Sequence, residues 1–337
     1  MTQKNIAING FGRIGRLAAR IITNHYPELN IVAVNDLTSP ENLAYLLQYD
    51  TTYRKFNHKV TVQDESLLIT KTDGSKQLIK VLSEKDPAKL PWSDLGVETV
   101  LECTGFFLTE ELATLHIDAG CKRVIMSAPA KDSTPTVVLG VNDGIILPTN
   151  PSVLSNASCT TNCISPALKV LQESFGVDQV WSLTSHAYTA TQVLQDGPSK
   201  KDFRDGRSAP NNQVPSSSGA SKAVEIVLPE LKGKVHVMSL RVPVITGSLV
   251  YMTVQLSKKV SVEEINTAFL IASNNDLRGV LEFSMEDLVS SDVIGDSHSC
   301  IVDGKLTEVS GNTAKIVLWY DNEWGYANRL VELVTQV

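Results

Sequence analysis

The chain has no long hydrophobic run and no excess of positive charge. No stretch approaches the roughly 18 uninterrupted apolar residues that a membrane-spanning helix needs, so we do not expect a membrane protein. The 30 lysines and arginines are outnumbered by 37 aspartates and glutamates, and the net charge is −7. Proteins that bind nucleic acid through overall charge are strongly basic, so this balance argues against that class.

Cysteine is scarce as well. The five cysteines, at positions 103, 121, 159, 163 and 300, are odd in number and lack zinc-ligand spacing. This pattern argues against a disulfide framework or a metal site and favours a reducing compartment. Residues 5–9 form an apolar run that leads directly into a glycine motif, which is not the pattern of a signal peptide. We therefore expect a cytoplasmic protein without a metal.

Apolar residues, in contrast, make up 42% of a chain of 337 residues, which is long enough for two domains. Up to about residue 150, short apolar runs alternate with helix-like stretches, at 5–9, 13–24, 31–35, 40–48, 97–103, 109–119 and 122–127. This rhythm is typical of βαβ units on a mostly parallel sheet. Residues 59–82 interrupt it with polar–apolar alternation, which predicts an inserted antiparallel hairpin.

The second half has a different pattern. Strand-like runs at 178–184, 235–243, 248–256 and 314–320 are separated by helical candidates at 219–231 and 261–273, which predicts an α+β domain on a largely antiparallel sheet. We expect residues 1–158, completed by a C-terminal helix at about 322–337, to form the first domain and residues 159–321 the second. The long polar segment at 189–214 is of a length that is usually functional or interfacial.

A glycine fingerprint lies near the start of the chain, as Gly10, Phe11, Gly12, Arg13, Ile14 and Gly15. It follows an apolar strand, opens a helix, and is followed about 20 residues later by Asp36, the pattern of a Rossmann-type NAD-binding domain. Gly10 would allow a tight turn, Gly12 the approach of the pyrophosphate, and Gly15 helix–strand contact. Asp36 would bind the ribose hydroxyls and repel a 2′-phosphate, which favours NAD over NADP. The alternative is a glycine-rich turn that binds no nucleotide.

A candidate nucleophile lies where the second half begins. Small and hydroxyl residues at 155–158 precede Cys159, and an apolar helical pattern follows it as far as Gly176. The thiol should therefore lie at a helix N-terminus, where unpaired N–H groups and the helix dipole favour an anion. We expect Cys159 to ionise more easily than an ordinary cysteine. With a nicotinamide, such a thiol suggests aldehyde oxidation through a thioester.

A cysteine nucleophile needs a base or a cationic partner. His186 ends a strand run and opens the long polar segment, which is a place where catalytic groups collect. From position alone, a structural role for His186 is as plausible as a catalytic one. The other histidines, His25, His58, His116, His236 and His298, are expected to have surface or packing roles.

Several motifs resemble those of phosphorylating glyceraldehyde-3-phosphate dehydrogenases. They are Ser-Asn-Ala-Ser-Cys-Thr-Thr-Asn-Cys at 155–163, His-Ala-Tyr-Thr-Ala-Thr-Gln at 186–192, Arg-Val-Pro at 241–243 and Trp-Tyr-Asp-Asn-Glu-Trp-Gly-Tyr at 319–326. The similarity runs essentially end to end. It implies a homotetramer that converts glyceraldehyde 3-phosphate, NAD and inorganic phosphate to 1,3-bisphosphoglycerate. Cys159 would form the hemithioacetal and thioester, and His186 would lower the thiol pKa and act as the base.

The resemblance also implies the binding residues. The substrate phosphate would be held by Thr189, Thr191 and Arg241, the attacking phosphate by Ser158, Thr160, Ser218 and Gly219, and either one by Arg204. The cofactor would contact Thr104, Ser127, Asn322 and Tyr326 in addition to the fingerprint and Asp36. Ser218 departs from the family pattern, in which threonine is usual.

Two alternatives stay open. Erythrose-4-phosphate dehydrogenase shares the nucleophile motif, although the residues after His186 favour the triose enzyme. The chain could also be a non-catalytic paralogue that kept the fold as an NAD-binding or redox-sensing module. A basic cluster, Lys200, Lys201, Arg204 and Arg207, is interrupted by aspartates and is not expected to bind RNA.

Overall fold

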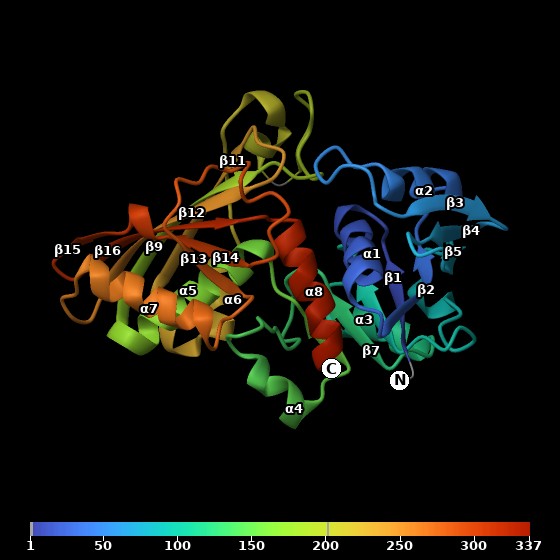
Figure 1. The fold of residues 1–337 in the computed structure, drawn as a ribbon, viewed down its shortest axis with the longest axis horizontal. Coiled ribbons are helices and arrows are strands. Elements are labelled where there is room, and N and C mark those ends of the chain that lie inside the picture. Colours follow the sequence, from blue (N-terminus) through green and yellow to red (C-terminus); the bar gives the residue numbers. More distant parts are fainter. Residues whose placement is uncertain (1–2, 201) are drawn as a thin grey trace. The chain divides into compact units, whose positions relative to one another are not determined.

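The computed structural model describes residues 3–200 and 202–337, so Lys201 of the basic cluster lies outside the described residues. The chain divides into two compact units. The first contains the residues up to Val137, Gly144–Ala157 and Ala327–Val337, and the second contains Val138–Asp143 and Ser158–Tyr326. In Figure 1 the blue and cyan strands belong to the first unit and the orange and red strands to the second.

The first unit is built on an eight-stranded sheet in the order β3-β4-β5-β2-β1-β6-β7-β8. Its parallel strands are β1 (Lys4–Asn9), β2 (Leu29–Asn35), β6 (Thr99–Glu102), β7 (Arg123–Met126) and β8 (Val153–Ser155). The helices are α1 (Arg13–His25), α2 (Pro40–Gln48), α3 (Glu110–Asp118) and the short α4 (Ile146–Thr149). Ser39 and Thr109 start α2 and α3, because each side chain accepts a hydrogen bond from a first-turn N–H.

The predicted antiparallel insertion is confirmed. It consists of β3 (Lys59–Gln63), β4 (Ser66–Thr70) and β5 (Lys76–Leu82), which pair as an antiparallel meander. β5 also pairs with β2 in parallel, so the insertion extends the main sheet instead of standing apart from it.

The second unit has a sheet in the order β10-β11-β9-β12-β16-β14-β13, with β15 paired to β16. The strands are β9 (Val177–Ala187), β10 (Val214–Ser216), β11 (Val235–Val242), β12 (Ser248–Leu256), β13 (Leu281–Ser284), β14 (Cys300–Asp303), β15 (Glu308–Ser310) and β16 (Thr313–Tyr320). Most pairs are antiparallel, and β9–β11 and β13–β14 are parallel. The predicted fold class is confirmed for both units.

Three helices pack on one side of this second sheet, α5 (Cys159–Phe175), α6 (Ala220–Val227) and α7 (Val262–Asn274). Figure 1 shows them gathered below the strands. Along β9, Val180, Ser182 and Thr184 are buried, whereas Trp181 and Leu183 are exposed on the opposite face. One face of the sheet therefore lies against the helices and the other presents apolar side chains.

Two segments of the structure differ from what the sequence pattern predicts. The helix expected at 219–231 ends at Val227, and a 3-10 turn, Pro229–Leu231, follows it, because Pro229 has no N–H with which to continue the helix. Residues 138–143 group with the second unit and not with the first. Gly140 explains this difference, because its carbonyl accepts a hydrogen bond from Lys169 at 2.7 Å and it packs closely against Leu277.

The segment at 189–214 contains only two short 3-10 turns before β10 begins, Phe203–Gly206 and Ala209–Asn211, so the predicted loop is confirmed over its described residues. α8 (Trp324–Gln336) ends the chain, and its residues from Ala327 belong to the first unit. None of the helices formed by residues 3–200 and 202–337 is both long and apolar enough to cross a membrane.

Candidate active site

Cys159 is the first residue of α5, as the sequence predicts. Ser158 is the N-cap, and its Oγ accepts a hydrogen bond from the Thr161 N–H at 3.1 Å. The N–H of Cys159 is among the first four of the helix, which have no intrahelical partner. Cys159 as a residue is half-buried, whereas Cys163 one turn later is buried.

Sheet register brings a base and a cation to this thiol. His186 is the penultimate residue of β9, and Arg241 of β11 stands directly opposite it in the parallel pair. His186 Nε2 lies 3.3 Å from Cys159 Sγ. Arg241 Nη1 lies 2.6 Å from His186 Nδ1. The structure thus brings together three of the predicted site residues, Cys159, His186 and Arg241.

His186 Nδ1 faces both a donor and an acceptor, because the Ala187 carbonyl oxygen lies 2.7 Å away. In a neutral imidazole this nitrogen either accepts from Arg241 or donates to Ala187. In the first case the ring proton is on Nε2 and points at the thiol. In the second case Nε2 has a free lone pair that can receive the thiol proton. The position of Arg241 therefore determines which tautomer faces Cys159.

The pKa values of Cys159 and His186 are shifted in the directions that disfavour a thiolate–imidazolium ion pair. Burial, with the nearby Arg241 charge, lowers the pKa of His186 to about 3. Burial also raises the pKa of Cys159, by more than Arg241 and Thr160 lower it. The prediction that Cys159 ionises more easily than an ordinary cysteine is therefore wrong for this structure. The helix terminus lies where we expected, but the sequence does not reveal how much protein surrounds the thiol.

The other thiols are less suited to attack. Burial raises the pKa of Cys103 and of Cys121 to about 12, and the pKa of Cys163 also lies well above its usual value because of burial and the adjacent Cys300. Of the thiols with a shifted pKa, Cys159 is the one on which an arginine charge acts. This contrast supports Cys159 as the nucleophile.

Tyr320, at the end of β16, is a buried residue that contacts the site, and no pattern in the sequence indicates this role. Its hydroxyl lies 3.1 Å from Thr160 Oγ1 and 3.0 Å from Thr184 Oγ1, and its ring packs edge-on against His186. The hydroxyl of Thr160, expected at the attacking phosphate, can accept a hydrogen bond from Tyr320 and still has its own proton to donate. Tyr320 belongs to the motif at 319–326, but no spacing rule links it to His186.

The remaining phosphate candidates make local hydrogen bonds. The two hydroxyls of Thr189 and Thr191 lie 3.0 Å apart just beyond β9. Arg204 is exposed and pairs with Asp202, Ser218 accepts a hydrogen bond from the Ala220 N–H, and Gly219 is the N-cap of α6. Among the described residues, no hydrogen bond or ion pair joins these five to Cys159, His186 or Arg241.

In the first unit, a pocket of about 510 Å³ lies at the carboxyl edge of the sheet. Its lining includes Gly10, Gly12, Asp36 and Thr104. Gly10 has φ +88°, and a Cβ there would lie 2.7 Å from Thr104 N, whereas a Cβ at Gly15 would lie 2.3 Å from the Gly10 carbonyl oxygen. The positive φ of Gly10 agrees with the predicted tight turn, and the close contact at Gly15 leaves no room there for a side chain. A Cβ at Gly12 would meet nothing within 4 Å, so the N-terminus of α1 borders open space.

Asp36 holds the glycine loop beside this pocket through a hydrogen bond to the loop backbone. Its Oδ2 accepts a hydrogen bond from the Phe11 N–H at 2.8 Å, and its Oδ1 accepts one from the Thr38 N–H at 3.0 Å. Each carboxylate oxygen keeps a second lone pair. Arg13 and Ile14 are the first two residues of α1, and Arg13 forms an ion pair with Asp50. The Ser127 N–H donates a hydrogen bond to the Glu102 carbonyl oxygen.

In the second unit, two hydroxyls fix the orientation of the Asn322 amide. Asn322 Oδ1 accepts a hydrogen bond from Ser248 Oγ at 2.9 Å, and it shares the single hydroxyl proton of Thr246, 3.2 Å away, with Asp321 Oδ1. The amide NH₂ is therefore the group left to donate. Ser248 Oγ also accepts the Ala187 N–H at 3.1 Å, so one hydroxyl connects the residue after His186 with Asn322. Tyr326 is buried at the start of α8.

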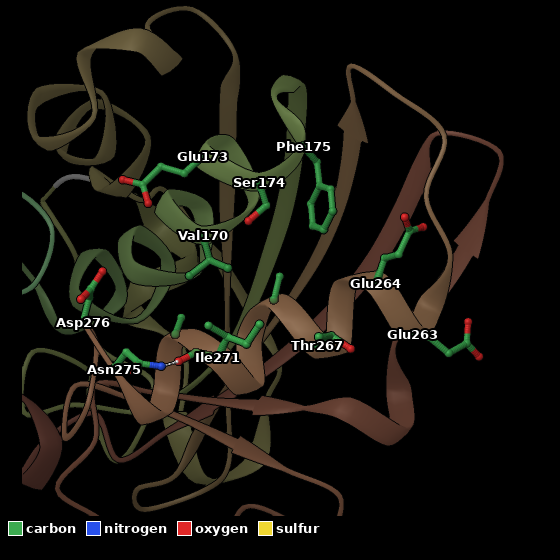
Figure 2. Close-up of a pocket in the computed structure, with 12 residues that line it drawn as sticks. Val170, Glu173, Ser174, Phe175, Glu263, Glu264, Thr267, Ile271, Asn275 and Asp276 are labelled. Atoms are coloured by element: carbon green, nitrogen blue, oxygen red, sulfur yellow. Dashed lines mark hydrogen bonds between the residues drawn. The ribbon is translucent and has the colours of Figure 1, made fainter.

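A separate groove of about 540 Å³ lies between α5 and α7, at the opposite end of α5 from Cys159 (Figure 2). Phe175 and Ile271 line its apolar part, and Glu173, Glu263 and Asp276 lie at its rim. None of the predicted site residues lines this groove. Its lining offers carboxylates but no thiol or imidazole, so it is not the place for the predicted chemistry.

Comparison with known proteins gives concordant matches. Residues 4–110 match the family model described as the glyceraldehyde 3-phosphate dehydrogenase NAD binding domain, and residues 158–322 match the corresponding C-terminal domain. The chain is 48% identical over 332 residues to glyceraldehyde-3-phosphate dehydrogenase 2 of Streptomyces arenae, covering 98% of both chains. It is 48% identical over 337 residues to glyceraldehyde-3-phosphate dehydrogenase 1 of Trichormus variabilis, covering 99% of this chain and 96% of that one. It is 46% identical over 334 residues to the Chlamydia pneumoniae enzyme, covering 98% of both.

Proposed function

Because the chain belongs to the glyceraldehyde-3-phosphate dehydrogenase family and is an NAD-dependent oxidoreductase, we propose that it converts glyceraldehyde 3-phosphate and inorganic phosphate to 1,3-bisphosphoglycerate in glycolysis and gluconeogenesis. The observation that carries the proposal is the distance of 3.3 Å between Cys159 Sγ and His186 Nε2, at the N-terminus of α5. A thiol, an adjacent imidazole and a helix N-terminus together suit covalent attack on a carbonyl carbon.

In the first step, Cys159 Sγ bonds to the aldehyde carbon and the thiol proton passes to His186 Nε2. The developing oxyanion accepts hydrogen bonds from the Cys159 N–H and from protonated His186. The oxyanion then takes up the proton, which gives a neutral hemithioacetal on Cys159. The neutral state of His186, caused by burial and Arg241, keeps this base available throughout the neutral pH range.

Arg241 couples substrate binding to this base. A substrate phosphate dianion would attract the guanidinium away from His186 Nδ1, since charge-assisted hydrogen bonds to phosphate are stronger than one to a neutral imidazole. Nδ1 then donates to the Ala187 carbonyl oxygen at 2.7 Å, and Nε2 presents its lone pair to the thiol. Thr189 and Thr191 add hydroxyl donors at the same end of β9.

In the second step the hemithioacetal loses a hydride from carbon and a proton from oxygen. NAD, when bound, supplies the hydride acceptor. His186 Nε2 takes the hydroxyl proton, and a thioester on Cys159 remains. Inorganic phosphate, held by Ser158, Thr160, Ser218, Gly219 and Arg204, attacks the thioester carbon, and the Cys159 thiolate leaves.

The residues of the carboxyl-edge pocket fit NAD. The open space at Gly12 lies beside the N-terminus of α1, whose N–H groups suit a pyrophosphate. Asp36 borders the pocket with lone pairs for the ribose hydroxyls, and Thr104 and Ser127 belong to neighbouring strand ends. The amide NH₂ of Asn322, oriented by Ser248 and Thr246, would donate to the nicotinamide carboxamide, with Tyr326 nearby in the chain.

The test is absorbance at 340 nm with glyceraldehyde 3-phosphate and NAD, with and without inorganic phosphate. We expect sustained NADH formation that requires phosphate. A single burst that phosphate does not relieve would refute the acyl-phosphate step, and no signal would favour the non-catalytic paralogue. A larger kcat/KM for erythrose 4-phosphate than for the triose would overturn the proposed substrate.

Replacing Asp36 tests cofactor preference. Asp36→Gly should raise the KM for NAD and lower the ratio of kcat/KM for NAD over NADP by at least about tenfold, because the charge that repels a 2′-phosphate is lost. Asp36→Asn is the matched control, since its amide oxygen can still accept the Phe11 N–H bond. If the asparagine variant also accepts NADP, charge repulsion is the cause. An unchanged ratio in both variants would remove Asp36 from this role.

We also propose that the enzyme is a cytoplasmic homotetramer. The bacterial relatives and the five free cysteines support the location. The exposed apolar face of the second sheet supports the assembly. On this face Leu183 stands between Met238 and Tyr251 in register, and Trp181 stacks on His236 in the next row. A row of exposed apolar side chains across three strands suits a second copy of the chain.

A charge placed in this row should weaken the assembly. We expect Leu183→Lys to shift the protein from tetramers to smaller species in light scattering coupled to size-exclusion chromatography, because two copies would bring like charges into an apolar contact. Leu270→Lys, at an exposed site on α7, is the control and should leave the mass unchanged. A tetrameric Leu183→Lys would place the interface elsewhere.

A further inference from the structure

A buried polar network lies beneath the nucleotide pocket, around Glu102 at the end of β6. Glu102 is completely buried, and its carboxylate accepts four hydrogen bonds. Oε2 accepts from Asn9 Nδ2 at 2.5 Å and from His116 Nε2 at 3.2 Å. Oε1 accepts from the Thr104 N–H at 2.7 Å and from the Thr104 hydroxyl. A buried carboxylate without its partners would be costly, and here all its partners are in place.

One arm of the network fixes the tautomer of His116. Trp92 Nε1 can only donate, and it lies 3.0 Å from His116 Nδ1, so Nδ1 must be the acceptor. The proton of the neutral ring is therefore on Nε2 and points at Glu102. Trp92 and His116 are both completely buried. From its position in the sequence, His116 is expected to have only a surface or packing role.

The second arm fixes the orientation of Asn9. The Glu84 N–H donates to Asn35 Oδ1 at 2.9 Å, so the Asn35 amide nitrogen faces Asn9 and donates to its Oδ1 at 2.7 Å. Asn9 must then direct its own NH₂ at Glu102. Each of the two hydrogen-bond chains starts from a group that can only donate, the Trp92 Nε1–H or the Glu84 N–H, and each ends at the Glu102 carboxylate. Asn9 Nδ2 and His116 Nε2 lie 3.4 Å apart because they share Oε2.

The network contacts the pocket through residues at three strand ends. Asn9, Asn35 and Thr104 all line the pocket. Thr104 N is also the atom closest to where a Cβ at Gly10 would stand, so the glycine loop packs directly against the Thr104 backbone. Glu102 accepts hydrogen bonds from both the N–H and the hydroxyl of Thr104 and thereby holds this contact.

We propose that Glu102 and His116 are positioning residues of the NAD site, which hold Thr104 and Asn9 so that the pocket is formed before NAD arrives. Neither residue touches the cofactor. The proposal rests on the proposed placement of NAD in the carboxyl-edge pocket. A pocket fixed in advance binds more tightly, because less ordering is needed on binding. The network should therefore determine NAD affinity and leave the chemistry at Cys159 unchanged.

His116→Phe tests this role in the full-length enzyme. It keeps a ring in the cavity but leaves one Glu102 lone pair and the Trp92 N–H without partners. We expect the Kd for NAD, measured by calorimetric titration, to rise about tenfold, with kcat at saturating NAD within about twofold of wild type. His116→Gln can donate to Glu102 and accept from Trp92, and it should restore most of the affinity. Glu102→Gln, which loses acceptor capacity at the same centre, should weaken NAD binding as His116→Phe does.

His58→Phe is the matched control in the same unit. His58 is buried, and its Nδ1 accepts the Thr72 N–H at 3.2 Å, but it does not line the nucleotide pocket. It should lower the melting temperature without changing the Kd for NAD. An equal loss of NAD affinity in His58→Phe, or wild-type affinity in both His116→Phe and Glu102→Gln, would overturn the positioning role. If His116→Phe does not fold, Glu102→Gln decides in the same titration. A wild-type protein that does not bind NAD would overturn the proposed cofactor site together with this inference.

Discussion

Cys159→Ser is expected to abolish sustained NADH formation, with kcat reduced by more than about 10³-fold. The serine hydroxyl is far harder to ionise than a thiol, and the same His186 at 3.3 Å cannot compensate for that difference. The loss should also include the first turnover, because no thioester can form. Stopped-flow absorbance at 340 nm, with and without phosphate, measures both the burst and the steady rate.

Cys163→Ser is the matched control for this change. Cys163 lies one turn further along α5 and is completely buried, so its thiol packs in the core and does not meet substrate. We expect its kcat to stay within about twofold of wild type, with a modest loss of stability from the buried hydroxyl. An inactive Cys163→Ser enzyme, or a Cys159→Ser enzyme that still shows a burst, would contradict the assignment of the nucleophile.

The parts of both sites that could be predicted are those encoded locally. The glycine fingerprint specifies a turn whose conformation only glycine adopts easily, and Gly10 has that positive φ. Ser158 and the apolar pattern after Cys159 specify the start of α5, because a helix cap and a helical period are both readable within a few residues. Local chemistry of this kind does not depend on the rest of the fold.

The parts that could not be predicted depend on register and burial. Arg241 faces His186 because β9 and β11 pair in parallel, and 55 residues separate the two in the chain. The raised thiol pKa comes from protein packed around Cys159, which no helix-terminus rule reports. His116 looked like an ordinary helix residue, since its partners Trp92 and Glu102 come from distant segments. Family resemblance supplied names for the contact residues, but not the hydrogen bonds that orient them.

His186→Asn should lower kcat by about 10²–10⁴-fold at neutral pH, because asparagine cannot act as a base. It can accept neither the thiol proton of Cys159 nor the hydroxyl proton of the hemithioacetal. Alkylation of Cys159 by iodoacetamide separates these two roles. In the wild-type enzyme the neutral imidazole assists loss of the thiol proton once a phosphate dianion has drawn Arg241 away from Nδ1, so with phosphate present alkylation should be slower in the variant at pH 7. Since burial raises the pKa of Cys159, its thiolate fraction in the variant grows as the pH increases toward that pKa.

The alkylation difference between wild type and His186→Asn should therefore shrink from pH 7 to pH 10, whereas the difference in kcat should persist, because the hydride step still lacks its base. His25→Asn, at an exposed histidine at the end of α1, is the control and should change neither rate. Equal alkylation rates in wild type and variant at pH 7 would exclude His186 from activating the thiol. An alkylation rate in wild type that is constant from pH 6 to pH 9 would indicate a preformed thiolate–imidazolium pair, in contradiction to the pKa directions that burial and Arg241 impose.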